Sequence, residues 1–243
     1  MNYIDEFIFI SPRDDCHEIV DEMLAVNYAE DFCVSNDFSP EFITRLMEAG
    51  FLIMSAELPD LAGATESFYV LFPKLHTVRS ALLFENLHIK KSIRRHLKKY
   101  ELRPDVEFDR IIENCIKKHG NDWLTPPLVY SIREIRRRYL HKTGTNKDKK
   151  LVPVTGVYPA SFGLYRDGEL TAGEFGVVCG KVYTSYSGYY DEDNAGTVQL
   201  ILATKYLQEN GFTFFDLGMP LDYKSALGAV NVSPHEFIKL FRK

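Results

Sequence analysis

The sequence predicts an α+β fold in which a small N-terminal α/β domain, residues 1–84, precedes a larger mixed-sheet domain, residues 85–243. Strand patterns dominate from Ser161 onward, and the Asp167-Gly168 pair between two of them is a strong hairpin signal. An amphipathic helix and an almost wholly apolar strand, residues 212–215, follow this region. Helices, then three consecutive strands, then a helix and a further strand are typical of a mixed sheet with helices packed on it.

The bulk composition indicates a soluble globular protein, with 45% hydrophobic and 26% charged residues among 243. The four cysteines form no C-x-x-C pair and have no histidine at metal spacing, so we expect reduced thiols. The chain begins MNYIDEF, without a secretory signal pattern, and has no apolar run near the ~20 residues of a membrane span. These features predict a cytoplasmic protein that does not bind membranes, and we expect a monomer.

The first 84 residues show helix and strand signals in alternation. A helix is expected near residues 17–25, and Ser39-Pro40-Glu41 is a good start for a second one, with a side-chain cap and proline in the first turn. Gly50 should end that helix. Residues 51–55, 68–71 and 81–84 then read as strands.

A concentrated basic segment follows at residues 89–100. Ile89, Ile93 and Leu97 recur every four residues and predict a helix with one apolar stripe. Two parallel basic stripes lie beside it, and no acidic residue occurs between Glu85 and Glu101. The stripes contain Lys90, Lys91, Arg94, Arg95, Lys98 and Lys99. Although the net charge is -5 and a solvated helix face is a common alternative, this pattern favours phosphate binding.

The remaining elements follow in order. Helices are expected at residues 108–118 and from Thr125-Pro126-Pro127 to about residue 139, with a polar, mobile loop at 141–150. Strands are expected at 162–166, 169–178 and 182–187, a helix at 195–207, and closing helices at 222–227 and 234–241. Together these elements suggest the mixed sheet of acyltransferase-type α+β folds.

Asp216 ends the apolar strand, just before a turn at Gly218. Open α/β sheets place ligands at the carboxyl ends of their strands, so this carboxylate is a candidate functional group. Alternatively, its side chain caps the Gly218 turn by accepting a backbone hydrogen bond, and spacing alone slightly favours that interpretation.

Several enzyme classes are excluded by missing motifs. The sequence has no G-x-S-x-G, no Walker loop, no H-E-x-x-H, and no G-x-G-x-x-G between a strand and a helix. Acetyltransferases that use CoA need a glycine-rich turn to cradle pyrophosphate at a helix start. Residues 191–196 read DEDNAG at that place, and their carboxylates would repel a pyrophosphate.

An ordered set of motifs resembles the bacterial leucyl/phenylalanyl-tRNA–protein transferases. Its members are Phe84-Glu85-Asn86-Leu87-His88-Ile89 with the basic stripes, Asp122-Trp123-Leu124-Thr125, Arg166-Asp167-Gly168-Glu169-Leu170, Phe215-Asp216 and Ser225-Ala226-Leu227-Gly228-Ala229. The resemblance covers roughly residues 39–241 and implies a GNAT-like second domain. It implies that leucine or phenylalanine moves from charged tRNA to the N-terminal Arg or Lys of a protein, marking it for N-degron-type degradation. It implies no metal and no dissociable cofactor.

The resemblance also assigns roles to residues. Lys90, Lys91, Arg94, Arg95, Lys98 and Arg79 would contact the tRNA acceptor stem, while Trp123, Gly218 and Phe175 would bind substrate. Asp216 would act on the acceptor amine, since a carboxylate can take a proton from, or orient, an ammonium group that must become nucleophilic. An aminoacyl ester is already activated, so the enzyme needs mainly to hold an amine near it.

The chain departs from the family pattern at three points of this site. Ser185-Tyr186-Ser187 replaces a Gly-Glu-Ser context, Gly218 replaces a glutamine, and Glu174 lies where an apolar pocket residue is expected. In one interpretation Glu174 supplies the missing carboxylate, Tyr186 donates a hydrogen bond, and donor or acceptor specificity has shifted. In the other, the protein is a diverged tRNA- or ligand-binding protein without this reaction. An N-acetyltransferase that uses CoA is a further alternative. We favour retained aminoacyl transfer.

Overall fold

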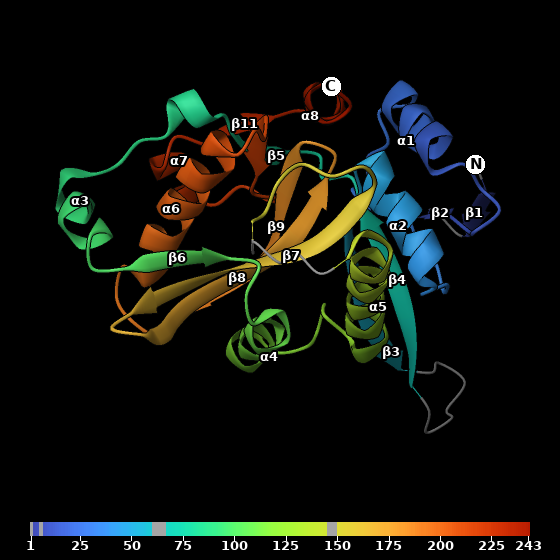
Figure 1. Ribbon diagram of the computed structural model, residues 1–243. Helices are drawn as coiled ribbons and strands as arrows, with labels where there is room; N and C mark the ends of the chain where they lie inside the picture. Colours follow the sequence, from blue (N-terminus) through green and yellow to red (C-terminus); the bar gives the residue numbers. More distant parts are fainter. Residues whose placement is uncertain (1, 5–6, 60–66, 145–149) are drawn as a thin grey trace. The chain divides into compact units, whose positions relative to one another are not determined.

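The computed structural model describes residues 2–4, 7–59, 67–144 and 150–243, which form two compact units (Figure 1). The first unit contains Met1–Thr77, Gly120–Ile135 and Ser233–Lys243, and the second contains Val78–His119 and Arg136–Val232. The expected boundary at residue 84 lies near the first crossing, after Thr77. The chain crosses between the units again after His119, Ile135 and Val232.

The first unit combines two hairpins with helices. Its elements are β1 (Asn2–Ile4), β2 (Phe7–Phe9), α1 (Cys16–Ala25), α2 (Pro40–Ala49), β3 (Leu52–Pro59), β4 (Ser67–Lys74), the first half of α5 (Pro126–Thr143) and α8 (Pro234–Phe241). The predictions of α1, α2 and α8 are confirmed, and Gly50 ends α2 in the left-handed conformation, with φ of 104°. Ser39 does not cap α2 as expected; its hydroxyl donates to Asp37 instead.

Residues distant in sequence complete this unit. A Cβ on Gly50 would lie 2.8 Å from Cδ1 of Ile238, so α8 packs directly against the end of α2. Arg242 donates from Nη1 to Oδ1 of Asp21 at 2.6 Å, which ties the segment after α8 to α1. The last eleven residues therefore belong to the same core as the first seventy-seven.

The second unit is built on one mixed sheet. Its elements are β5 (Arg79–Leu82), a 3-10 turn at Phe84–Asn86, α3 (Lys91–Leu97), β6 (Glu101–Pro104), α4 (Phe108–His119), the second half of α5, β7 (Val157–Arg166), β8 (Glu169–Cys179), β9 (Val182–Tyr190), α6 (Ala195–Glu209), β10 (Phe214–Asp216), α7 (Asp222–Ala226) and β11 (Val230–Val232). The expected mobile loop at 141–150 lies partly outside the described residues, and α5 extends into it as far as Thr143.

The seven strands lie in the order β11-β5-β10-β9-β8-β7-β6. The predicted meander is confirmed, because β7, β8 and β9 pair antiparallel in succession. The turn between β7 and β8 has positive φ at both Asp167 and Gly168, as the hairpin signal requires. Only β10 runs parallel to its neighbour β9, and it pairs with it at residues 182–184 alone. Beyond residue 184, β9 has no strand partner on that side among the residues described.

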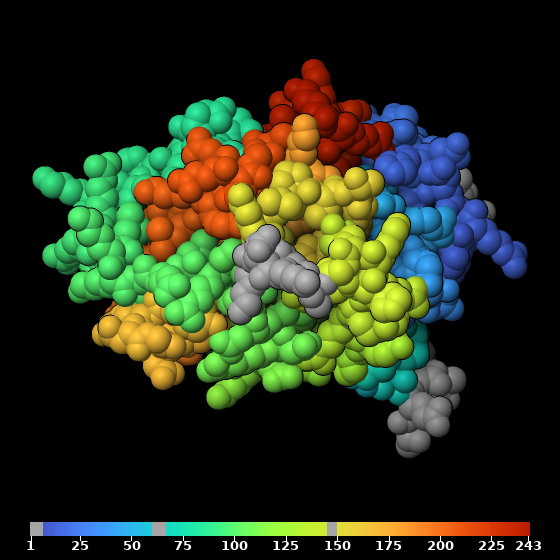
Figure 2. Space-filling view, in the orientation of Figure 1, coloured from blue at the N-terminus to red at the C-terminus, as the bar shows by residue number. Residues whose placement is uncertain are grey.

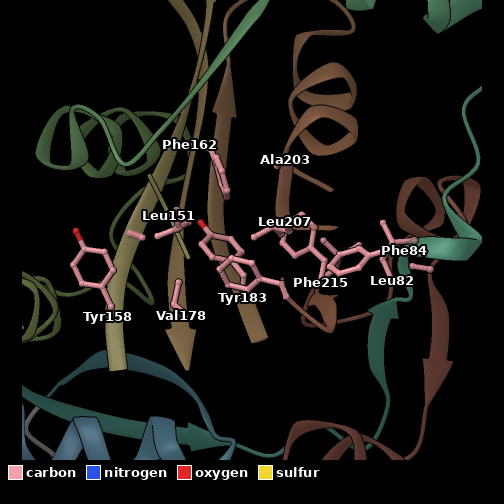
Figure 3. Close-up of a cluster of buried hydrophobic side chains, with 14 residues drawn as sticks. Leu82, Phe84, Leu151, Tyr158, Phe162, Val178, Tyr183, Ala203, Leu207 and Phe215 are labelled. Carbon is pink, nitrogen blue, oxygen red and sulfur yellow. The ribbon is translucent and has the colours of Figure 1, made fainter. Parts of the chain in front are cut away.

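One face of the sheet is covered by α6, and the core lies between them (Figure 3). Tyr183 on β9 packs edge-on against Phe215 of β10 and Phe162 of β7, with ring centroids 5.4 and 5.2 Å apart. Leu207 and Ala203 of α6 belong to the same buried cluster. These contacts fix which side chains of the sheet face α6.

The structure contains short strands that the pattern did not predict: β1, β2, β6 and β11. It also shortens the basic helix, because α3 covers only Lys91–Leu97 of the expected residues 89–100. No side chain caps α3, its first turn has no acidic residue, and the chain turns into β6 at Glu101. Cys16, Cys33 and Cys115 are buried free thiols, as expected. Within the described residues, none of the helices has the length and apolar character that crossing a bilayer requires.

Candidate functional site

Asp216 lies at the end of β10 and forms a buried ion pair with Arg79 of β5. Nε of Arg79 donates to Oδ1 at 2.9 Å and Nη2 donates to Oδ2 at 2.6 Å. The Thr184 hydroxyl donates to Oδ2 at 2.9 Å and the Gly218 amide donates to Oδ1 at 3.0 Å. The predicted cap of the Gly218 turn is therefore present, and both carboxylate oxygens are occupied.

The charge state of Asp216 follows from these contacts. Burial by itself acts to raise the pKa of its carboxyl group, but the Arg79 guanidinium and the hydrogen bonds from Gly218 and Thr184 together hold that pKa below its ordinary 3.8. A carboxylate that is ionised and saturated with donors is a weak proton acceptor. In this arrangement Asp216 organises the turn at residues 216–218.

Arg79 does not have the position expected of a tRNA contact. Its side chain is 2% exposed and binds Asp216, so it cannot reach a phosphate on the surface. The resemblance grouped it with the basic residues around α3. The partner that explains its burial lies 137 positions along the chain.

Glu174 and Asp216 leave the sheet on opposite faces. Glu174 accepts a hydrogen bond from Nε2 of Gln199 on α6, so it faces α6. Phe215 also packs on the α6 side, and successive residues of a strand point to opposite faces, so Asp216 faces away from α6. The structure thus brings Asp216 together with Gly218 and Arg79 and does not bring it into contact with Glu174.

The Glu174 carboxyl group is buried and incompletely bonded. It is 2% exposed, its bond from Gln199 is long at 3.4 Å, and Oε1 has no hydrogen-bond partner in the described part of the chain. Burial raises its pKa to about 7, against smaller lowering effects of the Gln199, Ser185 and Tyr183 side chains nearby. The Ser185 and Tyr183 hydroxyls lie close enough to Glu174 to stabilise its charged form and so to lower its pKa. Glu174 is therefore poised to exchange a proton near neutral pH.

A β-bulge lies beside Glu174, between β8 and β9. Phe175 pairs with Ser187 and Gly176 pairs with Ser185, so Tyr186 is the extra residue on β9. Phe175 is fully buried and packs against the half-buried Tyr186, with ring centroids 6.1 Å apart. Bulges are common next to active sites, where they re-aim a side chain.

Gly176 allows β9 to approach the bulge. A Cβ at this position would lie 2.2 Å from the carbonyl oxygen of Thr184 and 2.8 Å from the Tyr183 hydroxyl. A larger residue would displace both. Glycine is therefore required for the close packing that sets Tyr183 beside Glu174.

Lys224 of α7 is a buried charged residue that the sequence motifs did not single out. Its Nζ donates to the carbonyl oxygens of Leu217 at 2.5 Å and Met219 at 2.8 Å, which fastens α7 to the turn after Asp216. Burial lowers the pKa of its ammonium group to about 8, against the opposing effects of the Asp216 and Glu174 charges. The residues around Lys224 in the sequence do not indicate that it is buried; only its closeness to the Gly218 turn points to the site.

The basic side chains around α3 are all exposed to solvent. They belong to Lys90, Lys91, Arg94, Arg95, Lys98 and Lys99. None of them forms an ion pair with a carboxylate in the described residues; Arg94 donates to the Ile89 carbonyl oxygen and Arg95 to His96. Ile93 anchors the helix in a buried cluster with Ala195 and Val198 of α6. Figures 1 and 2 show α3 beside α6.

Trp123 belongs to the first unit, where it is half-buried. Its carbonyl oxygen accepts hydrogen bonds from the amide and the hydroxyl of Ser55, both at 3.0 Å. The Ser55 hydroxyl also bonds the Thr125 hydroxyl at 2.7 Å. The segment that carries Trp123 is therefore fastened to β3 just before α5 begins.

Two of the sequence motifs pack against each other. Gly228 has φ of 100°, and a Cβ there would lie 1.9 Å from the carbonyl oxygen of Asn86. Next to it the His88 amide donates to the Leu227 carbonyl oxygen at 2.8 Å. The segments at residues 84–89 and 225–229 thus form one structural element that joins α7 to the start of α3.

The acidic loop before α6 is partly neutralised from within the unit. Glu192 accepts hydrogen bonds from Nη1 of Arg166 at 2.7 Å and from the Tyr100 hydroxyl at 2.9 Å. Asp191 and Asp193 are exposed. An acidic loop at the start of α6 does not fit a pyrophosphate at this helix end.

The second unit thus combines a mixed seven-stranded sheet, buried polar side chains and an exposed basic helix. The sequence model of the family described as leucyl/phenylalanyl-tRNA protein transferase matches residues 81–242. The chain belongs to this family. The matched region includes β5 from Ala81 onward, α3, Glu174, Asp216 and α7.

Curated relatives carry the same description. The leucyl/phenylalanyl-tRNA–protein transferase of Maridesulfovibrio salexigens is 26% identical over 213 residues, which cover 85% of this chain and 78% of that protein. That of Pseudomonas entomophila is 27% identical over 165 residues, covering 65% of each chain. The chain therefore spans about two thirds of the length of the second relative.

Solved structures show only a remote likeness. The C-terminal domain of a putative lysylphosphatidylglycerol synthetase from Agrobacterium fabrum is 13% identical, with a TM-score of 0.36, and the match covers 89% of this chain and 63% of that one. A score this low carries no argument about fold or function.

Proposed function

We propose that this protein transfers an aminoacyl group from charged tRNA to the N-terminal amine of an acceptor protein, with Arg or Lys at the acceptor terminus. Leucine and phenylalanine are the groups that the family description names. The observation that carries the proposal is the exposed basic surface around α3, which has no acidic partner in the described residues. The helix itself packs on α6, which also carries Gln199, the hydrogen-bond donor to Glu174. Such a surface attracts a phosphate backbone.

Because the aminoacyl ester is already activated, the enzyme mainly has to orient the acceptor amine and accept its proton. The acceptor amine attacks the ester carbonyl carbon, the amide C–N bond forms, the ester C–O bond breaks, and the terminal ribose hydroxyl of the tRNA leaves. The proton lost by the amine must reach an acceptor, and Glu174 has a pKa of about 7 that suits this task. We assign Glu174 as the proton acceptor and Tyr186 as a hydrogen-bond donor at the bulge.

The other candidate residues have supporting roles in this proposal. Asp216 would position the turn that carries Gly218, and it would act on the amine directly only if its pair with Arg79 opened. Phe175 would support the ring of Tyr186. Substrate binding by Trp123 stays a prediction from the resemblance. No metal and no dissociable cofactor takes part, and the reaction would occur in the cytoplasm within the N-degron route.

The proposal is tested by mixing the protein with tRNA charged with radiolabelled amino acid and with a peptide that begins with Arg or Lys. We expect labelled peptide, and none when the peptide N-terminus is acetylated. A family member of established activity serves as the positive control. If that control reacts and this protein labels no peptide with any charged tRNA, transfer is refuted.

The second candidate is a tRNA-binding protein without turnover, which the saturated carboxylate of Asp216 favours. This candidate predicts that the protein binds charged tRNA and that no labelled peptide forms. Acetyl-CoA should leave the melting temperature unchanged under both proposals, whereas an acetyltransferase would be stabilised by it.

A further inference from the structure

Four large apolar side chains are exposed on two neighbouring segments of the second unit. Met219, Leu221 and Tyr223 lie between β10 and α7 or at the start of α7, and Tyr190 ends β9. Each of the four is between 42% and 52% exposed. Burial raises the pKa of Tyr223, and the charges of Glu174 and Tyr190 raise it further, so the two tyrosines lie near each other. We call these four side chains the apolar surface.

Both segments that present the apolar surface are fixed by contacts within the unit. Nζ of Lys224 donates to the carbonyl oxygens of Leu217 and Met219, which holds the chain between β10 and α7. The Tyr190 ring lies on the start of α6, because a Cβ on Gly196 would be 3.0 Å from its Cδ1. The four side chains are therefore held in place although they are exposed. Neighbouring exposed apolar side chains of this kind mark an interaction site.

Carboxylates adjoin the apolar surface. Asp191 and Asp193 come directly after Tyr190, and Asp222 belongs to the other segment. All three are exposed, and none forms an ion pair in the part of the chain that the structure describes. Nζ of Lys118 lies 5.1 Å from the centre of the Tyr190 ring, so this ring already binds a cation that a basic ligand can replace. The charges fit a ligand that is both apolar and basic, and they would repel the phosphates of RNA.

The apolar surface adjoins the part of the sheet where we place the transfer reaction. Tyr190 is on the same strand as Tyr186, four residues beyond the bulge, and β9 has no strand partner on its β10 side there among the described residues. Met219 follows the Gly218 turn directly and begins the other segment. Because the α-amine of the acceptor enters the reaction, the surface beside the site is left for the residues that follow the amine.

We propose that the apolar surface binds the second and third residues of the acceptor protein, so that the protein prefers acceptors with large apolar side chains at these two positions. This inference rests on the proposed transfer reaction and concerns only the acceptor. A large apolar side chain leaves water when it docks on the surface, whereas glycine or serine gains almost nothing. The exposed carboxylates favour the positively charged first residue and disfavour acceptors with acidic residues near it.

The test is a competition between two peptides in one transfer reaction, with leucyl- or phenylalanyl-tRNA limiting. Both peptides begin with Arg. One continues with Phe-Leu and the other with Ser-Gly, and their remaining residues are identical. We expect the Arg-Phe-Leu peptide to be labelled about 10- to 100-fold faster, the factor that burying one or two apolar side chains gives. Because the peptides share the enzyme, the tRNA and the first residue, the ratio of labels reports only the residues that follow.

Substitutions on the surface should change this ratio. Met219→Ser with Leu221→Ser should bring it toward one, whereas Tyr223→Phe keeps the apolar area and should preserve it. Val26→Ser with Tyr130→Ser, a change of exposed apolar side chains on the first unit, is the matched control and should also preserve it. All these side chains are exposed, so each variant should fold. Affinity for uncharged tRNA should stay the same in all of them.

The outcomes separate this inference from the proposed function. Equal labelling of the two peptides by the wild-type protein overturns the inference and leaves the transfer reaction standing. A ratio that survives Met219→Ser with Leu221→Ser also overturns it. If neither peptide is labelled with any charged tRNA, the proposed function is refuted and the inference with it.

Two further measurements address other occupants of the apolar surface. If Met219→Ser with Leu221→Ser lowers the affinity for uncharged tRNA, RNA occupies the surface and the inference is overturned. If the wild-type protein dimerises at micromolar concentration in sedimentation and this double variant is monomeric, a second copy of the chain covers the surface, which again overturns the inference. We expect neither result.

Discussion

Arg79 and Asp216 are joined by two hydrogen bonds, from Nε to Oδ1 at 2.9 Å and from Nη2 to Oδ2 at 2.6 Å, with 2% and 0% of their side chains exposed. The pair links β5 to the last residue of β10. Because the amide of Gly218 and the hydroxyl of Thr184 donate to the same carboxylate, the pair also fixes the turn at residues 216–218, which precedes α7. The pair therefore holds the ends of β5 and β10 and the turn at Gly218 together.

Removing one member of this pair should destabilise the protein more than removing both. Asp216→Leu or Arg79→Met leaves an uncompensated buried charge, which typically costs about 3–5 kcal/mol. The double variant should lose less free energy of unfolding than either single variant, and so less than their sum, measured by urea unfolding. Arg110→Met, which breaks the exposed pair with Glu107, should change stability by less than about 1 kcal/mol. Additive losses would show that the two side chains are not coupled.

The buried carboxyl group of Glu174 should make stability depend on pH. Its pKa rises from 4.5 to about 7 on folding, so the folded state holds the proton more tightly. The associated stability is present below pH 4.5 and is lost as the pH rises to 7, by an amount on the order of 3 kcal/mol. Glu174→Gln should therefore gain stability relative to wild type between about pH 5 and pH 8. A constant difference across this range would contradict the assignment.

Reversing charge on α3 should weaken RNA binding. Arg94→Glu with Arg95→Glu should lower affinity for tRNA and reduce the slope of log affinity against log salt by roughly one for each phosphate that the protein no longer neutralises. Lys239→Glu with Lys243→Glu changes the net charge equally, on exposed residues of the first unit, and is the matched control. Equal reductions in both double variants would show that only net charge matters.

Gly228 should not tolerate a side chain. Its φ is 100° and a Cβ would lie 1.9 Å from the Asn86 carbonyl oxygen, so Gly228→Ala must displace backbone. We expect the free energy of unfolding to fall by several kcal/mol, on the order of 3 or more, seen as a lower thermal midpoint. At Gly180 φ is also positive but nothing lies within 4 Å of a Cβ, so Gly180→Ala should cost only about 1–2 kcal/mol. Similar effects would mean that backbone conformation alone, not the contact with Asn86, matters at Gly228.

Sequence pattern predicted the elements that carry their own local signals. The helix ending at Gly50, the hairpin at Asp167-Gly168 and the capped helix after Ser233 are each specified by a few adjacent residues. The strands β6 and β11 have four and three residues, too few for a periodic pattern. They form because each pairs with a neighbouring strand at an edge of the sheet, and that pairing depends on the tertiary structure.

The candidate site was harder to predict because its contacts are long-range. The cap from Gly218 to Asp216 spans two residues and was anticipated, whereas the pairing of Asp216 with Arg79 spans 137. Glu174 was recognised as unusual, but its face of the sheet depends on the strand register and on the bulge at Tyr186. Lys224 gave no signal, since its burial follows from how α7 folds back on the turn.

The interleaving of the two units has a consequence for biosynthesis. The N-terminal part of the chain leaves the ribosome first. Ile238, which packs on Gly50, belongs to a segment that is translated after the whole second unit. The apolar face of α2 therefore stays uncovered, and open to chaperones and proteases, until residues 233–243 have been translated. Maturation of the N-terminal part is thereby tied to successful synthesis of the part that would handle the RNA.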